Sequence, residues 1–187
     1  MSLATTKSSN KSDRLSNVMP PGRNRVGLGI DTHQLIKGNL IRLCGVDIPS
    51  NVSIKAHSDG DVVYHAIADA ILGAIGAGDI GELFPDTDMK NKNLDSRIIV
   101  ENAVSKALSN GYILNNLDVT LLLESPKISI YKKQMYSNLI NIFNKLSPNN
   151  LIDESMINIK ASTSESLGFI GRGDGLTCYC ITSLRKM

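Results

Sequence analysis

The chain has three histidines, and all of them lie between positions 33 and 65. His33 follows Asp31 by two positions, so at the end of an extended strand the two side chains point the same way. With the more distant His65 they make a set of one carboxylate and two imidazoles. Three protein ligands of this kind leave the fourth position on a zinc ion open to substrate or water. The set therefore predicts a metal centre that can do chemistry.

His65 is expected on a helix, with Asp69 four residues later on the same face. A metal-bound histidine usually donates its second ring N–H to a carboxylate or a carbonyl group. Asp69 is predicted to accept that hydrogen bond. A histidine that is merely hydrogen-bonded on a half-buried helix is the plainer interpretation of His65. Only its combination with Asp31 and His33 favours the metal.

The segment 57–61, His-Ser-Asp-Gly-Asp, lies just before that helix. Backbone N–H groups at a helix start favour anions, and His57 and Ser58 add side-chain donors beside them. We expect Ser58 or Asp59 to cap the helix. The segment is predicted to bind a phosphate group, although a helix cap by itself explains most of the pattern.

Two later loops carry carboxylates and hydroxyl groups. Segment 78–88 is rich in turn formers, and its Asp79 and Asp86 could accept hydrogen bonds from sugar or polyol hydroxyls. A plain polar loop fits that segment equally well. Segment 161–165, Ala-Ser-Thr-Ser-Glu, follows a predicted strand. Its single carboxylate, Glu165, suits Mg²⁺, which often takes one or two carboxylates together with phosphate oxygens.

Arg172 lies in the glycine-rich segment 168–175. Glycines let the backbone approach a ligand closely, and the planar guanidinium matches the geometry of a phosphate group. The segment is therefore a second candidate for phosphate contacts.

The elements that must position these residues follow from hydrophobic periodicity. Alternating apolar residues predict strands, and apolar residues three and four apart predict helices. Gly111 and Pro126 are expected to end one helix and one strand. Strands mixed with helices indicate one sheet with helices against a face, in an α/β or α+β arrangement. Strands are predicted from about residue 25 and at 40–48, 117–124, 156–161 and 176–184, and helices at 61–77, 95–110 and 130–146.

Composition limits the classes of function. The chain has 187 residues, enough for one buried core, and 42% of them are hydrophobic. A net charge of +2 and 4% aromatic residues argue against nucleic-acid binding, and no apolar run reaches membrane-spanning length. Three cysteines without a paired spacing indicate small buried residues rather than disulfides.

Residues 1–24 are rich in Ser, Lys, Arg and Asn, contain one acidic residue, Asp13, and show no strand or helix period. They are predicted to be a disordered basic tail or the remnant of a transit peptide. The folded domain is expected to cover 25–187.

Together these motifs resemble the 2-C-methyl-D-erythritol 2,4-cyclodiphosphate synthase family, ring-closing enzymes of the non-mevalonate isoprenoid route. The resemblance covers residues 25 to about 184. The motifs that carry it are 29–33 (Gly-Ile-Asp-Thr-His), 56–61 with His65, 78–88, 125–127 (Ser-Pro-Lys) and 160–172.

The resemblance implies roles for individual residues. Asp31, His33 and His65 would bind zinc, and Glu165 would help to bind Mg²⁺ or Mn²⁺. His57 and Thr163 would stabilise the transition state. The substrate contacts it implies are Asp31, His33, His57, Ser58, Asp79, Ile80, Gly81, Phe84, Asp86, Asp88, Leu123, Pro126, Lys127, Ile128, Ser129, Ser162, Thr163, Glu165, Phe169 and Arg172.

The resemblance also implies an α+β fold, with a four-stranded mixed sheet and helices on one face. Three subunits would form a homotrimer with active sites at the subunit interfaces. The reaction it implies converts 4-diphosphocytidyl-2-C-methyl-D-erythritol 2-phosphate to the 2,4-cyclodiphosphate and CMP. Such a pathway beside a basic, Ser-rich tail suggests a plastid-type organelle, with a bacterial cytoplasm as the alternative.

Two other classes of function stay open from the sequence. A zinc phosphohydrolase would use the same three ligands to activate water and would release a hydrolysed phosphoester. A small-molecule-binding protein with structural zinc would close the coordination sphere with a fourth protein ligand. The cysteines lie far from the histidines in sequence, so no obvious fourth ligand exists.

Overall fold

The computed structural model describes residues 24–85, 87–91 and 93–187, so the predicted tail lies almost wholly outside the described residues. Its main sheet has five strands in the order β4-β1-β7-β5-β6. The pair β5–β6 is parallel and the other pairs are antiparallel, so the sheet is mixed. These strands are β1 (Arg25–Lys37), β4 (Val52–Lys55), β5 (Tyr112–Leu122), β6 (Ile157–Ser162) and β7 (Gly175–Lys186).

The mixed α+β architecture is confirmed, but the prediction of four strands is wrong by one. The extra strand is β4, a four-residue edge strand that pairs only with the end of β1. Its residues show no alternation of buried and exposed positions, because three of the four are half-buried. Alternation of apolar and polar residues is the main sequence signal for a strand, and such a short edge strand has no alternation to detect.

The predicted strand at 40–48 is a hairpin of β2 (Leu40–Leu43) and β3 (Val46–Pro49), which form a separate two-stranded sheet. The chain turns at Cys44 and Gly45, whose φ angles are 54° and 71°. A two-residue hairpin turn of type I′ needs positive φ at both central residues, and Asn-Gly or Asp-Gly is its usual signal. Cysteine in the first position hid this turn from the sequence.

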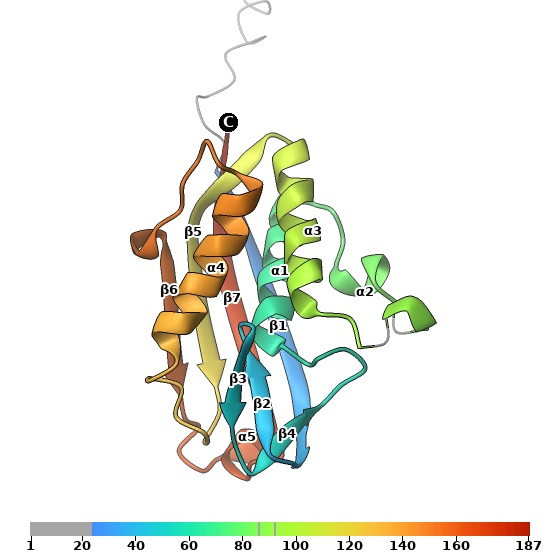
Figure 1. Cartoon of the computed structure of the whole chain (residues 1–187), viewed down its shortest axis with the longest axis vertical. Coiled ribbons are helices and arrows are strands. Elements are labelled where there is room, and N and C mark those ends of the chain that lie inside the picture. The colour runs from blue at the N-terminus through green and yellow to red at the C-terminus, as the bar shows by residue number, and fades with distance from the viewer. Residues whose placement is uncertain (1–23, 86, 92) are drawn as a thin grey trace, which may run out of the picture.

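Three long helices cover one face of the main sheet (Figure 1). They are α1 (Val62–Ile75), α3 (Ser96–Ser109) and α4 (Lys132–Leu146), and all three were predicted from the sequence. The short helical segments are α2 (Ile80–Leu83), η2 (Met89–Asn91), η3 (Glu154–Met156) and α5 (Gly168–Gly171). None of the helices in the described ranges has the length and apolar character needed to cross a bilayer.

The cap of α1 is Asp61, which corrects the prediction of Ser58 or Asp59. The Asp61 carboxylate accepts hydrogen bonds from the backbone N–H groups of Val63 and Tyr64, the usual pattern of an N-cap. It also accepts from Cys44 N at 2.8 Å and Gly45 N at 2.6 Å. This fully buried carboxylate therefore ties the β2–β3 turn to the start of α1.

The core lies between the sheet and the helices, and the opposite face of the sheet is open. Cys44, Cys178 and Cys180 are buried free thiols, as the sequence predicted. On the open face, β1 and β7 present a patch of large apolar side chains that are about half exposed. The open sheet patch consists of Val26, Leu28, Ile30, Tyr179 and Ile181.

Candidate metal centre and active site

Helix α1 lies directly on β1 because the strand has glycine where the two elements cross. Gly27 and Gly29 face the backbone of α1 around Ala70 and Ala66, with no side chain between them. Asp31 and His33 follow on the same strand, and His65 precedes Ala66 on the helix. The close crossing therefore brings the two predicted halves of the metal site together.

The three predicted metal ligands converge around one oxygen atom. Asp31 Oδ2 lies 3.1 Å from His33 Nε2 and 3.0 Å from His65 Nδ1. One ligand atom from each residue fits within a common 4.8 Å. His65 is buried, with 7% of its surface exposed, while the side chains of Asp31 and His33 are each 20% exposed. The cluster is therefore buried on the side of α1, where His65 lies, and partly open to solvent on the side of Asp31 and His33.

Electrostatics keep the Asp31 carboxyl ionised. Burial by itself raises the pKa of Asp31, but the hydrogen bonds from His33 and His65 outweigh it and hold the pKa well below its usual range. A carboxylate and two imidazole nitrogens are the donor types that zinc takes in catalytic sites. The donor set therefore suits a divalent cation of that kind.

The second nitrogen of His65 does not contact Asp69, which corrects the prediction for that residue. His65 Nε2 lies 2.8 Å from Ser96 Oγ, at the first position of α3. Asp69 instead accepts a hydrogen bond from Ile80 N at 2.8 Å. It anchors α2, since its side chain holds the first N–H of that short helix.

A cleft of about 250 Å³ opens beside the three ligands. His57 and Ser58 line it from the segment before α1, and Ile80, Gly81 and Phe84 line it from α2. The sequence predicted all five of these residues for a single site. Three further lining residues were missed, because neither the segment before α3 nor the first turn of that helix shows a pattern that points to a ligand: Asn91, Leu94 and Ile99.

The carboxylates of segment 78–88 that the structure describes do not line this cleft. Asp79 caps α2 through Glu82 N at 2.9 Å, and Asp88 accepts from Lys90 N at 3.0 Å. Both bonds are typical of loop and helix caps, the plainer of the two interpretations. Asp86 lies outside the described residues.

A second cleft, of about 230 Å³, lies where the parallel strands β5 and β6 end side by side. It is separate from the first, with no lining residue in common. The candidate residues that line it are Leu123, Pro126, Lys127, Ile128, Ser129, Ser162 and Thr163.

Glu124, which lines the same cleft, organises the loop that follows β6. Its Oε1 accepts hydrogen bonds from Ser164 N at 2.9 Å, Ser164 Oγ at 3.1 Å and Ser166 N at 3.4 Å. In that loop the Thr163 hydroxyl donates to Glu165 Oε1 at 2.7 Å, and Glu165 has a φ of 52°. A non-glycine residue with positive φ is strained, and such strain clusters at functional sites.

Phe169 and Arg172 lie on and after α5, away from both clefts. Both are exposed, and Arg172 Nε lies 2.8 Å from Asp174 Oδ2. Their predicted substrate contacts are therefore not assembled within one chain.

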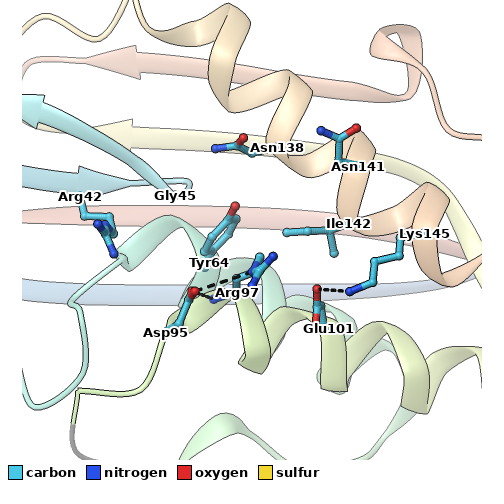
Figure 2. Close-up of a pocket in the computed structure, with 10 residues that line it drawn as sticks. All are labelled: Arg42, Gly45, Tyr64, Asp95, Arg97, Glu101, Asn138, Asn141, Ile142 and Lys145. Carbon is cyan, nitrogen blue, oxygen red and sulfur yellow. Dashed lines mark hydrogen bonds and ion pairs between the residues drawn. The ribbon is translucent and has the colours of Figure 1, made fainter.

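A further cleft, of about 350 Å³, lies between the β2–β3 turn, α3 and α4 (Figure 2). It contains none of the predicted site residues. Its cations face carboxylates, since Lys145 lies 3.4 Å from Glu101 and Arg97 lies 3.7 Å from Asp95. With these charges paired, nothing in the cleft selects an ionic ligand.

The sequence model of the YgbB family matches residues 24–185. The bifunctional enzyme IspD/IspF of Campylobacter curvus is 43% identical over 182 residues, which are 96% of this chain and 47% of that protein. The 2-C-methyl-D-erythritol 2,4-cyclodiphosphate synthase of Acinetobacter baumannii (strain AYE) is 45% identical over 152 residues, 81% of this chain and 91% of that one. The chain thus spans about half the length of the Campylobacter relative.

Solved structures have the same fold. The bifunctional IspDF from Campylobacter jejuni superposes with a TM-score of 0.82 and is 41% identical, covering 90% of this chain and 44% of that one. A Plasmodium falciparum IspF in a CDP complex superposes with a TM-score of 0.74 at 35% identity, covering 87% of this chain and 96% of that one.

Proposed function

The chain belongs to the YgbB family, and we propose that it is a phosphorus–oxygen lyase of isoprenoid biosynthesis. It converts 4-diphosphocytidyl-2-C-methyl-D-erythritol 2-phosphate to 2-C-methyl-D-erythritol 2,4-cyclodiphosphate and CMP. The observation that carries the proposal is the convergence of Asp31, His33 and His65 on one cleft that His57 and Ser58 also line.

Asp31, His33 and His65 would hold zinc in this proposal. Ligand atoms on one tetrahedral zinc lie about 3.3 Å apart, given zinc–ligand distances of about 2.0–2.1 Å. The Asp31 oxygen lies 3.1 Å from the His33 nitrogen and 3.0 Å from the His65 nitrogen, close to that spacing, and all three ligand atoms lie within 4.8 Å of one another. Glu165 would hold Mg²⁺ or Mn²⁺ in the loop after β6. When bound, the two ions polarise the diphosphate and neutralise charge on the departing CMP.

The residues of this chain then bind and align the substrate. Its 2-phosphate is mostly dianionic at pH 7, so it attacks the β-phosphorus without a general base. Holding the two ends in line can contribute about 7–11 kcal/mol. His57, in the first cleft, and Thr163, in the second, would donate hydrogen bonds to the oxygens on which charge develops.

The cleft at the ends of β5 and β6 is proposed to hold the cytidine part of the substrate. It is lined by Leu123, Pro126, Lys127, Ile128 and Ser129. A relative with a similar fold has a CDP complex, which supports a nucleotide diphosphate ligand. CMP would leave from this cleft.

A homotrimer with active sites at its interfaces explains two features of the single chain. The cleft of the metal ligands and the proposed nucleotide cleft share no lining residue, which supports a site that a neighbouring copy completes. The open sheet patch offers the apolar surface for such contacts, with Leu28 57% and Val26 67% exposed. Contiguous exposed apolar surface of this kind marks an association site.

The compartment proposal favours a bacterial cytoplasm over a plastid-type organelle. The curated relatives reported above come from Campylobacter and Acinetobacter. The basic tail on which the organelle prediction rested lies outside the described residues.

The test is to incubate the protein with the diphosphocytidyl substrate, Zn²⁺ and Mg²⁺, and to follow the phosphorus signals by NMR. The proposal expects the two coupled signals of a cyclic diphosphate and one equivalent of CMP. A linear phosphate with a hydrolysed monoester would identify a phosphohydrolase instead. No turnover, with zinc bound, would leave a binding protein.

A further inference from the structure

We propose that Ser96 and Asp59 are positioning residues for the metal centre, which fix the tautomer of His65. They hold its Nε2 protonated, so that Nδ1, the nitrogen that contacts Asp31, is the one that gives its lone pair to the cation when the metal is bound. The inference deepens the proposed function and rests on its metal centre.

Ser96 is placed to contact the far side of the imidazole. Its Oγ lies 2.8 Å from His65 Nε2, and the Ser96 side chain is fully buried, with 0% of its surface exposed. Ser58 Oγ lies farther from the same nitrogen, at 3.4 Å. Ser96 is therefore the main partner of the ring nitrogen that points away from the candidate metal position.

Asp59 fixes the direction of this hydrogen bond. The Ser96 hydroxyl donates to Asp59 Oδ1 in a short hydrogen bond, and Ser96 N donates to Asp59 Oδ2 at 3.1 Å. An ionised carboxylate can only accept, so the one hydroxyl proton of Ser96 is committed to Asp59. The Ser96 oxygen then accepts from His65, which requires the proton to be on Nε2.

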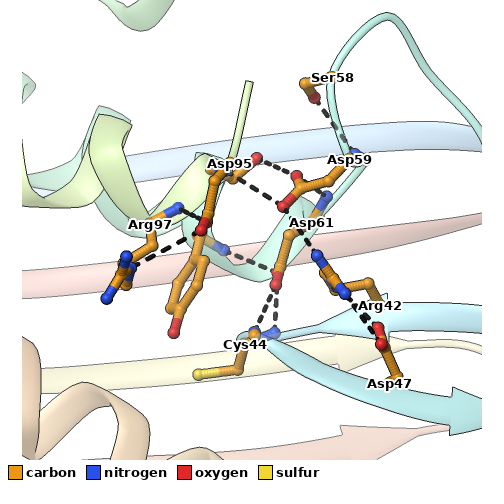
Figure 3. Close-up of polar contacts among 12 residues, drawn as sticks. Arg42, Cys44, Asp47, Ser58, Asp59, Asp61, Asp95 and Arg97 are labelled. Atoms are coloured by element: carbon orange, nitrogen blue, oxygen red, sulfur yellow. Dashed lines mark hydrogen bonds and ion pairs between the residues drawn. The ribbon is translucent and has the colours of Figure 1, made fainter. Parts of the chain in front are cut away.

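Besides Ser96, Asp59 contacts Arg42 of β2 and the backbone of Asp61 (Figure 3). Arg42 Nη1, from β2, lies 3.8 Å from Asp59 Oδ2, and Asp61 N donates to Asp59 Oδ1 at 3.3 Å. Arg42 is oriented by Asp47 of β3, through contacts of 2.6 and 2.8 Å. A continuous chain of contacts thus runs from the β2–β3 hairpin through Asp59 and Ser96 to His65.

Partners of this kind raise the basicity of a metal-bound histidine and keep its ring oriented. Their removal typically costs 10–100-fold in metal affinity. Here the carboxylate acts through a serine hydroxyl rather than directly, which explains why no carboxylate four residues along α1 is needed.

The experiment compares zinc affinity, by chelator competition, in the wild type, Ser96→Ala and Asp59→Asn. Both variants are expected to bind zinc roughly 10–100-fold more weakly, and Ser96→Thr, which keeps the hydroxyl, is expected to recover most of the loss. Ser105→Ala, on the exposed face of the same helix, is the matched control and keeps wild-type affinity. Circular dichroism checks that each variant is folded.

A second readout is the ¹H–¹⁵N spectrum of the histidine side chains in the zinc-loaded protein. The inference expects a protonated Nε2 and a metal-bound Nδ1 for His65. Wild-type affinity in a folded Ser96→Ala, or a proton on Nδ1, would overturn the inference and leave the proposed reaction standing. If the two variants bind zinc more weakly but the wild type forms no cyclic product, the proposed reaction is overturned and the positioning role stands.

Discussion

The backbone of Ala66 occupies the space that a side chain on Gly29 would need. A Cβ built on Gly29 would lie 2.0 Å from the Ala66 carbonyl oxygen and 2.6 Å from Ala70 N. Real Cβ atoms do not approach backbone atoms that closely. Helix α1 can therefore pack this closely on β1, and His65 can lie this close to Asp31, only while position 29 has no side chain.

Gly29→Ala is expected to push α1 away from β1 and to lower the free energy of unfolding by about 3 kcal/mol, as overpacked cores do. Zinc affinity falls with it, because His65 moves with the helix. Gly73→Ala is the control, since its added Cβ would meet only Leu28 O at 4.0 Å. That variant is expected to gain about 0.5–1 kcal/mol, as alanine replaces glycine within a helix. Denaturant unfolding measures the stability of both variants. Equal free energies of unfolding for Gly29→Ala and Gly73→Ala would contradict the packing argument.

His33→Ala is expected to weaken zinc binding by more than about 100-fold, because losing even an outer-shell partner costs about 10–100-fold. The fold should persist, since the His33 side chain is 20% exposed and lies at the surface of the cleft. His57→Ala, in the same cleft but outside the ligand set, should keep its zinc and lose turnover. Metal analysis after dialysis, together with the product assay, checks both variants. Normal turnover in metal-free His33→Ala would exclude the proposed role of zinc.

Glu165→Gln is expected to raise the Mg²⁺ concentration for half-maximal activity by at least about tenfold, equal to a loss of ~1.4 kcal/mol. Zinc should remain bound, because Glu165 is not among the three clustered ligands. Glu154→Gln, in η3, serves as the control for the loss of one negative charge. An unchanged magnesium titration would remove Glu165 from the divalent site.

Leu28→Asp is expected to convert a trimer to monomers and to abolish turnover, because it places a charge in the centre of the open sheet patch. Leu151→Asp, on a leucine that is even more exposed and lies outside that patch, should leave the assembly intact. Light scattering coupled to gel filtration measures both. A wild-type monomer with full activity would overturn the proposal that neighbouring copies complete the site.

Stability should depend on pH through Asp61. Burial raises the pKa of Asp61 from 3.8 to about 6, against the opposing N–H groups of Gly45, Cys44 and Tyr64. The folded chain then binds an extra proton between pH ~4 and ~6, so the free energy of unfolding falls by roughly 3 kcal/mol as pH rises through that range. Asp31 has the opposite effect, because its pKa is lowered in the folded chain. Its contribution to stability is lost only as pH falls below the ordinary pKa of an aspartate. Denaturant unfolding of the metal-free protein, measured from pH ~4 to ~6, should show this fall in the free energy of unfolding. The Asp61→Asn variant should not show it.

Local chemistry explains which predictions succeeded. Periodicity located α1, α3 and α4, and the Asp31-Thr32-His33 spacing placed two candidate ligands on one side of a strand, because both signals depend only on neighbouring residues. The same local logic failed at Asp69, which lies four residues after His65 and was predicted from that spacing to be its hydrogen-bond partner. The side chain instead accepts a hydrogen bond from Ile80 N, because the loop after α1 brings that N–H within its reach.

The sequence by itself determined the helices, most of the strands, and which residue types could hold a metal. Only the tertiary structure decided that Ser96 contacts both His65 and Asp59, that β4 joins the sheet, and that the proposed nucleotide cleft shares no lining residue with the cleft of the metal ligands. These relationships join residues far apart along the chain, and they depend on how closely α1 packs on β1. No periodicity encodes that distance, because it is set by the missing side chains of Gly27 and Gly29 and by the helix backbone that takes their place.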